Sequence, residues 1–188
     1  MPSRNQIKKY QIGGFYHIYN RGVEKREIFM EKRDYTYFLY KLKAYLEPLP
    51  KYTNHGANVR LLAYALMPNH FHLIVRNDRQ RGIEAFMRSL GTSYSMYFNK
   101  KYNRVGHLFQ GSYKAGLIKS EGDLLLKTRY VHRNPEEIWR GNLEDYPYSN
   151  YGYYLQEKEK PWLDRRMILE YFQGGSREYK EFVEKNLG

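Results

Sequence analysis

The chain contains no cysteine among its 188 residues. This absence excludes a disulfide framework, a thiolate nucleophile and any zinc or iron–sulfur centre held by cysteine. A metal site in this chain must therefore be built from histidine, carboxylate or amide ligands.

Long apolar runs are missing as well. The longest, at 61–67 and 72–75, fall far short of the roughly 18 residues that a membrane span requires. Residues 1–15 include basic side chains but no apolar stretch like that of a secretory signal peptide. We therefore expect a cytoplasmic chain that has no membrane partner.

Acidic residues are few beside the basic ones. Asp and Glu number 20 against 32 Lys and Arg, which gives a formal net charge of +12 and favours a polyanionic partner. The chain also has 21 tyrosines and an aromatic share of 17%, more rings than a core alone would use. Cations for phosphates and rings for unstacked bases together suit single-stranded nucleic acid. On composition alone, a ribosomal-type binder and a protein adapted to high temperature are equally compatible.

Hydrophobic periodicity predicts one main domain that mixes strands and helices. Asp34 and Ser120 stand where N-caps are expected. In chain order, the predicted elements are a strand at 14–20, a helix at 34–46, strands at 59–67 and 70–75, a helix at 82–102, a strand at 113–119 and a helix at 120–134.

This order predicts the split βαβ arrangement, an antiparallel sheet with helices on one face. The helix at 120–134 is expected as an addition to that core. A surface loop is expected at 51–58. The remainder is expected to be irregular at 146–154, with short helices at 163–172 and 177–187. The predicted fold class is therefore α+β, with a main domain at 1–155 and a C-terminal helical extension at 156–188 packed on or beside it.

Two histidines in the fourth predicted element are candidates for metal ligands. Side chains alternate across a strand, so His70 and His72 share one face while Phe71 points to the other. Two imidazoles side by side make half of a metal site, and a third ligand must come from elsewhere in the chain. The alternative is a pair of surface or hydrogen-bonded histidines with no metal.

Further candidates lie at the end of the last predicted helix. Tyr130 and Asn134 are four residues apart and share one helical face, which places a phenol one turn from an amide oxygen. Each has a plainer interpretation. Asn134 precedes proline in the Asn-Pro-Glu-Glu pattern of 134–137, which is typical of an N-cap that opens a new short helix. Tyr130 is one of many tyrosines, most of which are expected to pack.

Three stretches of sequence carry a resemblance to a known family: Leu-Met-Pro-Asn-His-Phe-His-Leu-Ile-Val at 66–75, Tyr-Asn-Arg-Val-Gly-His-Leu-Phe-Gln-Gly at 102–111, and Arg-Tyr-Val-His-Arg-Asn-Pro at 129–135. In this order they resemble the REP-associated tyrosine transposases, which are single-tyrosine HUH transposases. The segments 16–22 and 146–151 are also similar to that family, so the likeness spans most of 14–155.

The resemblance implies a ferredoxin-like HUH endonuclease core that cleaves and rejoins single-stranded DNA through a 5′-phosphotyrosine intermediate. It implies that His70, His72 and Asn134 hold the metal and that Tyr130 is the catalytic nucleophile. A divalent ion, Mg²⁺ or Mn²⁺, is the expected cofactor. The implied partners are single strands that form hairpins, of the repetitive extragenic palindrome type. The expected protein is a nucleoid-associated monomer or homodimer.

The DNA-binding surface is expected along the helix at 82–102 and its flanks. Tyr94, Tyr97 and Tyr102 are candidates for base stacking, although a core face with solvated charges would produce the same pattern. Lys114, Lys127 and Arg129 are the cations expected near the phenol of Tyr130. The candidate DNA-binding residues are Arg79, Arg81, Arg88, Lys100, Lys101, Arg104 and Lys114.

Two other functions fit parts of the sequence. A domesticated protein that binds DNA hairpins without cutting them would retain the same fold. A nucleotide hydrolase of the histidine-triad kind would need a third alternating histidine where Ile74 stands. Neither alternative would form a covalent adduct with DNA, and only the hydrolase would turn over a mononucleotide.

Overall fold

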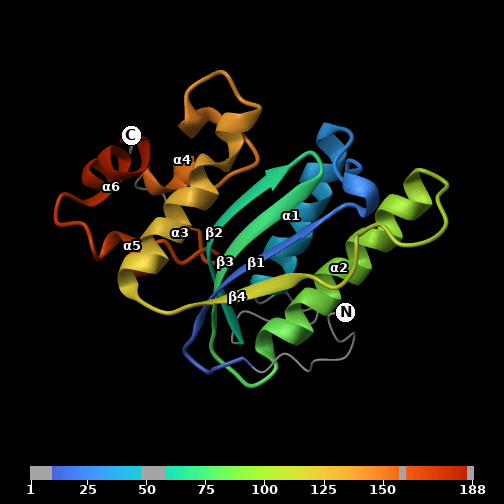
Figure 1. Cartoon of the computed structure of the whole chain (residues 1–188), viewed down its shortest axis with the longest axis horizontal. Coiled ribbons are helices and arrows are strands. Elements are labelled where there is room, and N and C mark those ends of the chain that lie inside the picture. The colour runs from blue at the N-terminus through green and yellow to red at the C-terminus, as the bar shows by residue number, and fades with distance from the viewer. Residues whose placement is uncertain (1–9, 48–57, 157–159, 186–188) are drawn as a thin grey trace.

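The computed structural model of the chain describes residues 10–47, 58–156 and 160–185. Its centre is a four-stranded antiparallel sheet in the order β2-β3-β1-β4 (Figure 1). The predicted strands and the α+β class are confirmed, whereas the loop expected at 51–58 lies almost wholly outside the described residues. The strands are β1 (Phe15–Arg21), β2 (Val59–Met67), β3 (His70–Asn77) and β4 (Lys114–Ile118).

Two helices, α1 (Lys32–Leu46) and α2 (Gly82–Lys101), cover one face of this sheet (Figure 1). Each connects strands that are not neighbours, which completes the predicted split βαβ order. The core between them is rich in rings, with Phe38 of α1 edge-on to Tyr94 of α2 and in contact with Phe71 of β3. Tyr94 is fully buried, so the expectation that it stacks on bases is wrong.

The first turn of α1 differs from the prediction in its cap. The N-cap is Glu31, and Asp34 is the third helical residue. The carboxylate of Asp34 accepts hydrogen bonds from the backbone N–H groups of Met30 and Glu31, at 2.9 and 3.1 Å. Asp34 therefore acts as the N3 residue of a capping box, because its side chain satisfies amides that no helical carbonyl reaches.

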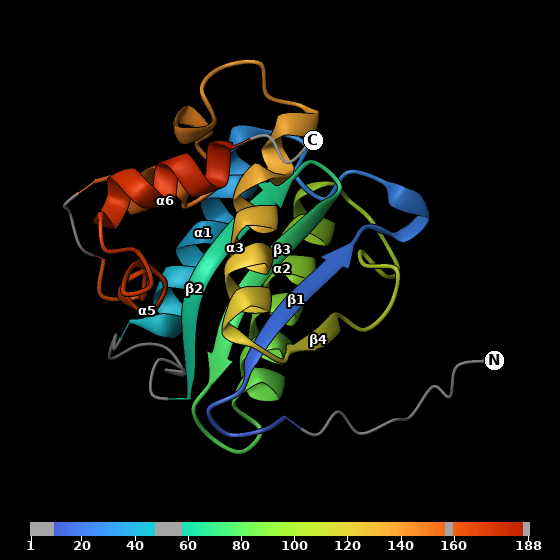
Figure 2. The ribbon, with the colours of Figure 1, turned by 60° about the vertical axis from the view of Figure 1, so that its left-hand side comes forward.

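The opposite face of the sheet is covered by α3 (Glu121–Arg133), which lies in front of the strands in Figure 2. The predicted N-cap is confirmed, since the Ser120 side chain accepts from the N–H of Asp123 at 3.1 Å. The buried residues Leu124 and Val131 of α3 belong to the same apolar cluster as Ile74 of β3. Helices thus lie on both faces: α1 and α2 on the predicted one, and α3 on the other.

The C-terminal part packs against α3 and not beside it as a separate body (Figure 2). Its helices are α4 (Tyr151–Tyr154), α5 (Arg166–Leu169) and α6 (Gly175–Glu184). The helix predicted at 163–172 is reduced to α5, because Lys160 and Leu163 form an isolated β-bridge and the N–H of Asp164 donates to the carbonyl of Leu61. The part of the chain that the structure describes has no helix long and apolar enough to cross a membrane.

The buried side chain of His132 connects α3 with Asn150 on one side and with α6 on the other. Nε2 of His132 lies 3.0 Å from Oδ1 of Asn150, which also accepts the N–H of Tyr64 in β2. On the other side of the ring, Nδ1 lies 2.7 Å from the hydroxyl of Tyr179 in α6. Because Asn150 Oδ1 can only accept, Nε2 carries the proton and Nδ1 accepts from Tyr179.

Two arginines of α3 hold the end of α6. Nε of Arg129 donates to the carbonyl of Phe182 at 2.8 Å, and its Nη2 donates to that of Lys185. Nη1 of Arg133 donates to the carbonyls of Val183 and Lys185 at 3.3 and 3.0 Å. These are carbonyls that the last turn of a helix leaves without helical partners, so the guanidinium groups act as its cap. Arg129 is therefore directed at α6 and is removed from the cations expected to assist Tyr130.

Candidate active site

The candidate site lies on the α3 face of the sheet, at the start of β3. His70 and His72 point to this face, while Phe71 is buried on the other against Phe38. The predicted alternation of these three residues is therefore confirmed. His72 is buried at 6% exposure, and the two imidazoles meet edge to face with ring centroids 5.0 Å apart.

A third histidine, which the sequence reasoning did not select, joins them from β1. Antiparallel pairing places Tyr19 opposite His72 and His17 opposite Ile74. Nε2 of His17 lies 2.8 Å from Nδ1 of His72, and the two rings lie edge to edge with their planes inclined by 21° and their centroids 5.0 Å apart. The alternation of β1 indicated which face His17 occupies, but its neighbour depends on the strand register, which no sequence pattern specified.

The phenol of Tyr130 comes from α3, and the amide of Asn134 comes from the residue that follows this helix. The Tyr130 ring is 49% exposed and stands edge-on to His72 and His17, with ring centroids 5.5 and 5.9 Å apart. Asn134 is 6% exposed, and its Oδ1 lies 3.1 Å from Nε2 of His70. The structure thus brings together all four residues selected from the sequence.

Asn134 is not an N-cap, so that plainer interpretation is wrong. Its backbone is itself helical, with φ −51° and ψ −38°, because a 3₁₀ turn over Asn134–Glu137 continues directly from α3. The residue in the cap position is Arg133, and no side chain makes a capping hydrogen bond to this turn. The Asn134 side chain is therefore directed to His70 and not to its own backbone.

The hydrogen bonds of His70 define where its lone pair points. Nδ1 lies 2.6 Å from Oδ1 of Asn69, and Nδ2 of Asn69 donates to the carbonyl of Lys25 at 3.3 Å, which fixes the orientation of that amide. Nδ1 of His70 therefore carries the single proton of a neutral imidazole. Its Nε2 then presents a lone pair toward Oδ1 of Asn134, itself an acceptor. Two acceptors that converge in this way are a suitable pair of ligands for a cation.

Burial keeps the three imidazoles neutral. It lowers the pKa of His72 to about 3, with further lowering from His17 and His70. Burial and the charge of Lys127 lower the pKa of His17 to about 4. Burial also lowers the pKa of His70, although the contact with Asn134 opposes this. Neutral imidazole is the form that binds metals, so near pH 7 the site is ready to act as a ligand set.

Within the described residues, no group of three or more His, Cys, Asp or Glu side chains is placed to hold a metal ion. A cation at this site would therefore need the amide oxygen of Asn134 as well as His70 and His72. Imidazole nitrogen and amide oxygen are both established ligands of divalent ions, so the donor set fits the group that the sequence resemblance implies.

One of the residues predicted to bind DNA is engaged elsewhere. Nζ of Lys101 pairs with the buried carboxylate of Asp34 and, at 2.7 Å, with Glu31. The hydroxyls of Tyr97 and Tyr102 also donate to Asp34, at 3.0 and 2.7 Å. This cluster, which we call the Asp34 cluster, fastens α2 to α1. The charge of Lys101 is paired, and these two hydroxyls are used within the fold.

The other predicted basic residues are spread over both ends of α2 and the start of β4. Arg79, Arg88, Lys100 and Lys114 are exposed, whereas Arg81 forms a surface ion pair with Glu84. Arg104 is half-buried against the ring of Phe98, with 5.7 Å between the guanidinium carbon and the ring centroid. Arg88 and Lys114 line hollows of the surface.

Three neighbouring hollows that share lining residues run from His17 around β4 to α2, and we call them together the β4 groove. The first, of about 230 Å³, is lined by His17, Tyr19, Lys114 and Lys127. The second, of about 360 Å³, shares Tyr19 and Lys114 with it. The third, of about 410 Å³, lies against α2. The second and third share Asn20, Gly111 and Ser112, and the third adds Arg88, Thr92, Ser95 and Met96.

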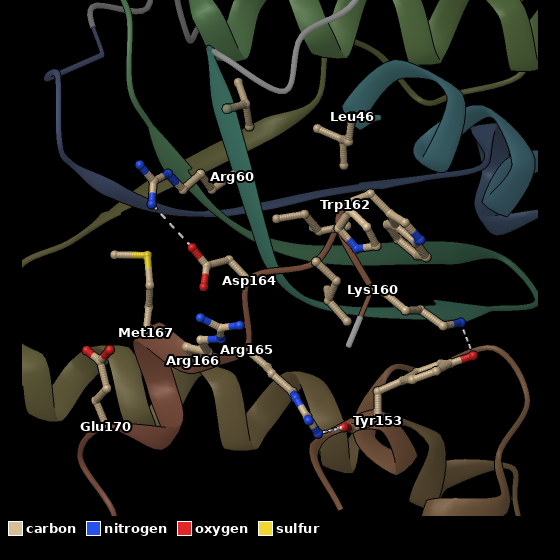
Figure 3. Close-up of a pocket in the computed structure, with 14 residues that line it drawn as sticks. Leu46, Arg60, Tyr153, Lys160, Trp162, Asp164, Arg165, Arg166, Met167 and Glu170 are labelled. Carbon is tan, nitrogen blue, oxygen red and sulfur yellow. Dashed lines mark hydrogen bonds and ion pairs between the residues drawn. The ribbon is translucent and has the colours of Figure 1, made fainter. Parts of the chain in front are cut away.

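A larger hollow of about 880 Å³ lies at the far end of β2, where Val59, Arg60 and Leu61 line it. This end pairs with the end of β3, and His70 is at the opposite end of that strand. Figure 3 shows that its cations are used internally: Arg60 bonds to Asp164, Lys160 to the Tyr153 hydroxyl and Arg165 to the Tyr153 carbonyl. We therefore place the candidate site at the histidines.

Comparison with known proteins gives a family and a fold. The family model described as "Transposase IS200 like" matches residues 22–134. A solved structure of a REP-associated tyrosine transposase bound to a REP hairpin is 15% identical, with a TM-score of 0.58, and the match covers 80% of this chain and 84% of that one. A candidate transposase from Deinococcus radiodurans is 16% identical, with a TM-score of 0.43 and coverage of 71% and 96%. No curated protein matches the sequence. The structure with the TM-score of 0.58 shares the fold described above.

Proposed function

The chain belongs to the family of IS200-like transposases, and on that premise we propose that it cuts and rejoins single-stranded DNA through a covalent bond to Tyr130. The observation that carries this proposal is the position of the Tyr130 phenol, which is half exposed and edge-on to two of three clustered neutral histidines. A phenol in that place is open to a DNA backbone and adjacent to the candidate metal ligands.

The chemical step is a transesterification. The Oη atom of Tyr130 attacks a backbone phosphorus in line, the new bond is phosphotyrosine, and the bond from phosphorus to the 3′ oxygen breaks. The phenolic proton is lost to water and the leaving 3′ oxygen gains a proton. The number of phosphodiester bonds is conserved, so a 3′ hydroxyl reverses the step without ATP.

Lys127 favours the attack. A phenol ordinarily ionises near pH 10, so an enzyme that uses one as a nucleophile must stabilise the phenolate as it forms. Lys127 is exposed, lies three residues before Tyr130 on α3 and lines the hollow that contains His17. Its ammonium group stabilises negative charge at this end of the site.

His70, His72 and Asn134 are the residues that would hold a divalent ion, Mg²⁺ or Mn²⁺. Such an ion supplies positive charge to a phosphate oxygen during phosphoryl transfer. The chain's own part is to keep both imidazoles neutral by burial and to hold the amide oxygen 3.1 Å from Nε2 of His70.

The proposed substrate is a hairpin-forming strand of palindromic repeat DNA, with its unpaired part in the β4 groove. The groove begins at His17, and it carries Lys114 and Arg88 for phosphates and Tyr19 as a ring surface. Arg79, Arg81 and Lys100 extend the basic surface at the ends of α2. We leave Lys101 and Arg104 out, because one is paired and the other is packed on Phe98.

The test is a denaturing gel of protein incubated with a panel of hairpin strands and Mn²⁺. We expect a covalent adduct with the unmodified protein and none with Tyr130→Phe. Tyr171→Phe is the matched control, since Tyr171 is similarly exposed at 41% and lies outside the site. An adduct that persists in Tyr130→Phe would remove this residue from the role.

A non-catalytic hairpin-binding protein is the second candidate function, and the same fold would serve it. It predicts hairpin binding with no adduct on any strand of the panel. In both cases binding that depends on phosphate contacts should weaken by orders of magnitude between about 50 and 200 mM salt. Lys114→Glu should weaken it further, whereas Arg177→Glu on the exposed side of α6 should not.

A further inference from the structure

His17 is not among the site residues selected from the sequence, and its contacts are specific. Its Nε2 lies 2.8 Å from Nδ1 of His72, at good hydrogen-bond length. Its ring also stacks on Tyr19, with centroids 5.2 Å apart at 26°, and meets Tyr130 edge-on. The ring is thus fixed on three sides and touches both a candidate metal ligand and the proposed nucleophile.

Only one proton can lie between the two nitrogens. If Nε2 of His17 donates, Nδ1 of His72 is the acceptor and a neutral His72 carries its proton on Nε2, where it blocks metal binding. If Nδ1 of His72 donates, Nε2 of His72 keeps a free lone pair. The two arrangements share the same distance and differ in what His72 can bind.

The contacts of His70 favour the second arrangement by analogy. Its Nδ1 donates to Oδ1 of Asn69, and its Nε2 faces Asn134. His72 is engaged at the same ring nitrogen, Nδ1, by His17. Both histidines therefore have Nδ1 tied to a neighbour on the protein side, which is the usual way that a protein fixes the tautomer of a metal-binding imidazole.

We propose that His17 is a positioning residue, whose Nε2 accepts the Nδ1–H of His72 and so keeps Nε2 of His72 free for a divalent cation. The inference rests on the proposed function in one respect, namely that His72 is a metal ligand. A neutral acceptor suits this place better than a carboxylate, because a negative charge here would repel the DNA phosphate that must approach Tyr130.

The first test reads the tautomer without any metal. In metal-free protein labelled with ¹⁵N at histidine, His72 is expected to show a protonated Nδ1 and a bare Nε2. In His17→Phe, which keeps a ring against Tyr19 and Tyr130 but has no acceptor, the signals should shift toward a mixture of both tautomers. A protonated Nε2 on His72 in the unmodified protein would overturn the proposal.

The second test measures Mn²⁺ affinity by electron paramagnetic resonance. Loss of the partner of a metal-bound histidine typically weakens metal binding by about 10- to 100-fold, which is the change expected for His17→Phe. His17→Gln offers a carboxamide oxygen as acceptor and should recover most of the affinity. His107→Gln, at an exposed residue of the loop after α2, is the matched control and should change nothing.

The outcomes separate this inference from the proposed function. Equal Mn²⁺ affinity in His17→Phe and the unmodified protein, with unchanged melting temperatures, would overturn the role of His17 alone. If the unmodified protein binds no Mn²⁺ and forms no adduct, the proposed function fails. Even in that case, the ¹⁵N signals of His72 would show whether its Nδ1 is protonated and so whether His17 accepts this proton.

Discussion

Replacing Asp34 with alanine is expected to destabilise the protein by about 3–5 kcal/mol, the usual result of removing one partner from a buried ion pair. Asp34 is fully buried and accepts from two backbone amides, two tyrosine hydroxyls and Lys101. A hydrogen bond to a charged group contributes about 1.5–3 kcal/mol, so the loss of five such contacts makes this range a conservative one.

The assay is urea unfolding at pH 7, followed by far-ultraviolet circular dichroism. Thermal unfolding gives a second measure. For a chain of this size a loss of about 1 kcal/mol in the free energy of unfolding lowers the melting temperature by about 2–4 °C, so Asp34→Ala should lower it by at least about 6 °C. Arg177→Ala removes an ion pair of α6 whose side chains are 89% and 67% exposed, and its effect should stay below about 1 kcal/mol. A loss below about 1 kcal/mol in Asp34→Ala would refute the reasoning.

Asp34 also makes the stability of the protein depend on pH. Burial alone would raise the pKa of Asp34, but hydrogen bonds from Lys101, Tyr102 and the amides of Met30 and Glu31 hold it below its ordinary value. The stability that the charged carboxylate of Asp34 adds is complete above about pH 4, the ordinary pKa of an aspartate in an unfolded chain. It is lost as the pH falls through the pKa of Asp34 in the folded protein. The difference in urea midpoint between the unmodified protein and Asp34→Asn should therefore shrink below about pH 4.

Three further predictions concern other contacts. Gly22→Ala should destabilise the protein by at least about 1 kcal/mol, because the new Cβ would lie 2.2 Å from the carbonyl oxygen of Arg26. Gly91→Ala in α2 is the contrasting variant: its Cβ would meet no atom within 4 Å, so it should stabilise the protein by about 0.5–1 kcal/mol. Thermal melts of both variants test this. His132→Phe should cost about 2–4 kcal/mol in urea unfolding, because it leaves the Tyr179 hydroxyl and an Asn150 lone pair unsatisfied in the core; full stability would refute the hydrogen-bond assignment. Arg133→Ala should increase amide hydrogen exchange at the end of α6 while leaving β1 and β3 unchanged; unchanged exchange in α6 would show that its carbonyls need no such cap.

The regular elements up to residue 133 could be predicted from the sequence because their periodicity was strong. The alternation that placed His70 and His72 on one face and Phe71 on the other needed only the geometry of a strand. Contacts between strands were different in kind. His17 reaches His72 through the register of β1 on β3, and that register depends on packing along the whole sheet.

Other differences arose where tertiary contacts outweighed local preference. The position of Asn134 before proline predicted an N-cap. In the structure its side chain contacts His70 instead, and its backbone continues from α3 without a break. Tyr94 had the helical spacing of either a core or a stacking residue, and only the packing of Phe38 and Phe29 around it decided between them. The C-terminal helices are short and are held by tertiary contacts, such as those of α6 with α3 and α5, so their own sequences predict their bounds poorly.

The attachment of α3 to α6 has a consequence for the order in which the molecule is completed. During synthesis, the strands and helices up to β4 leave the ribosome before the residues that pack behind α3. The contacts from Arg129 and His132 to α6 can form only when residues 179–185 have been added. The contacts of α3 with the sheet can form earlier, so the helix that carries Tyr130 gains its last set of contacts only when α6 is in place. A chain truncated before residue 179 would contain all four strands and α3 but would lack the contacts of α3 with α6, so the role proposed for Tyr130 would depend on the C-terminal helix.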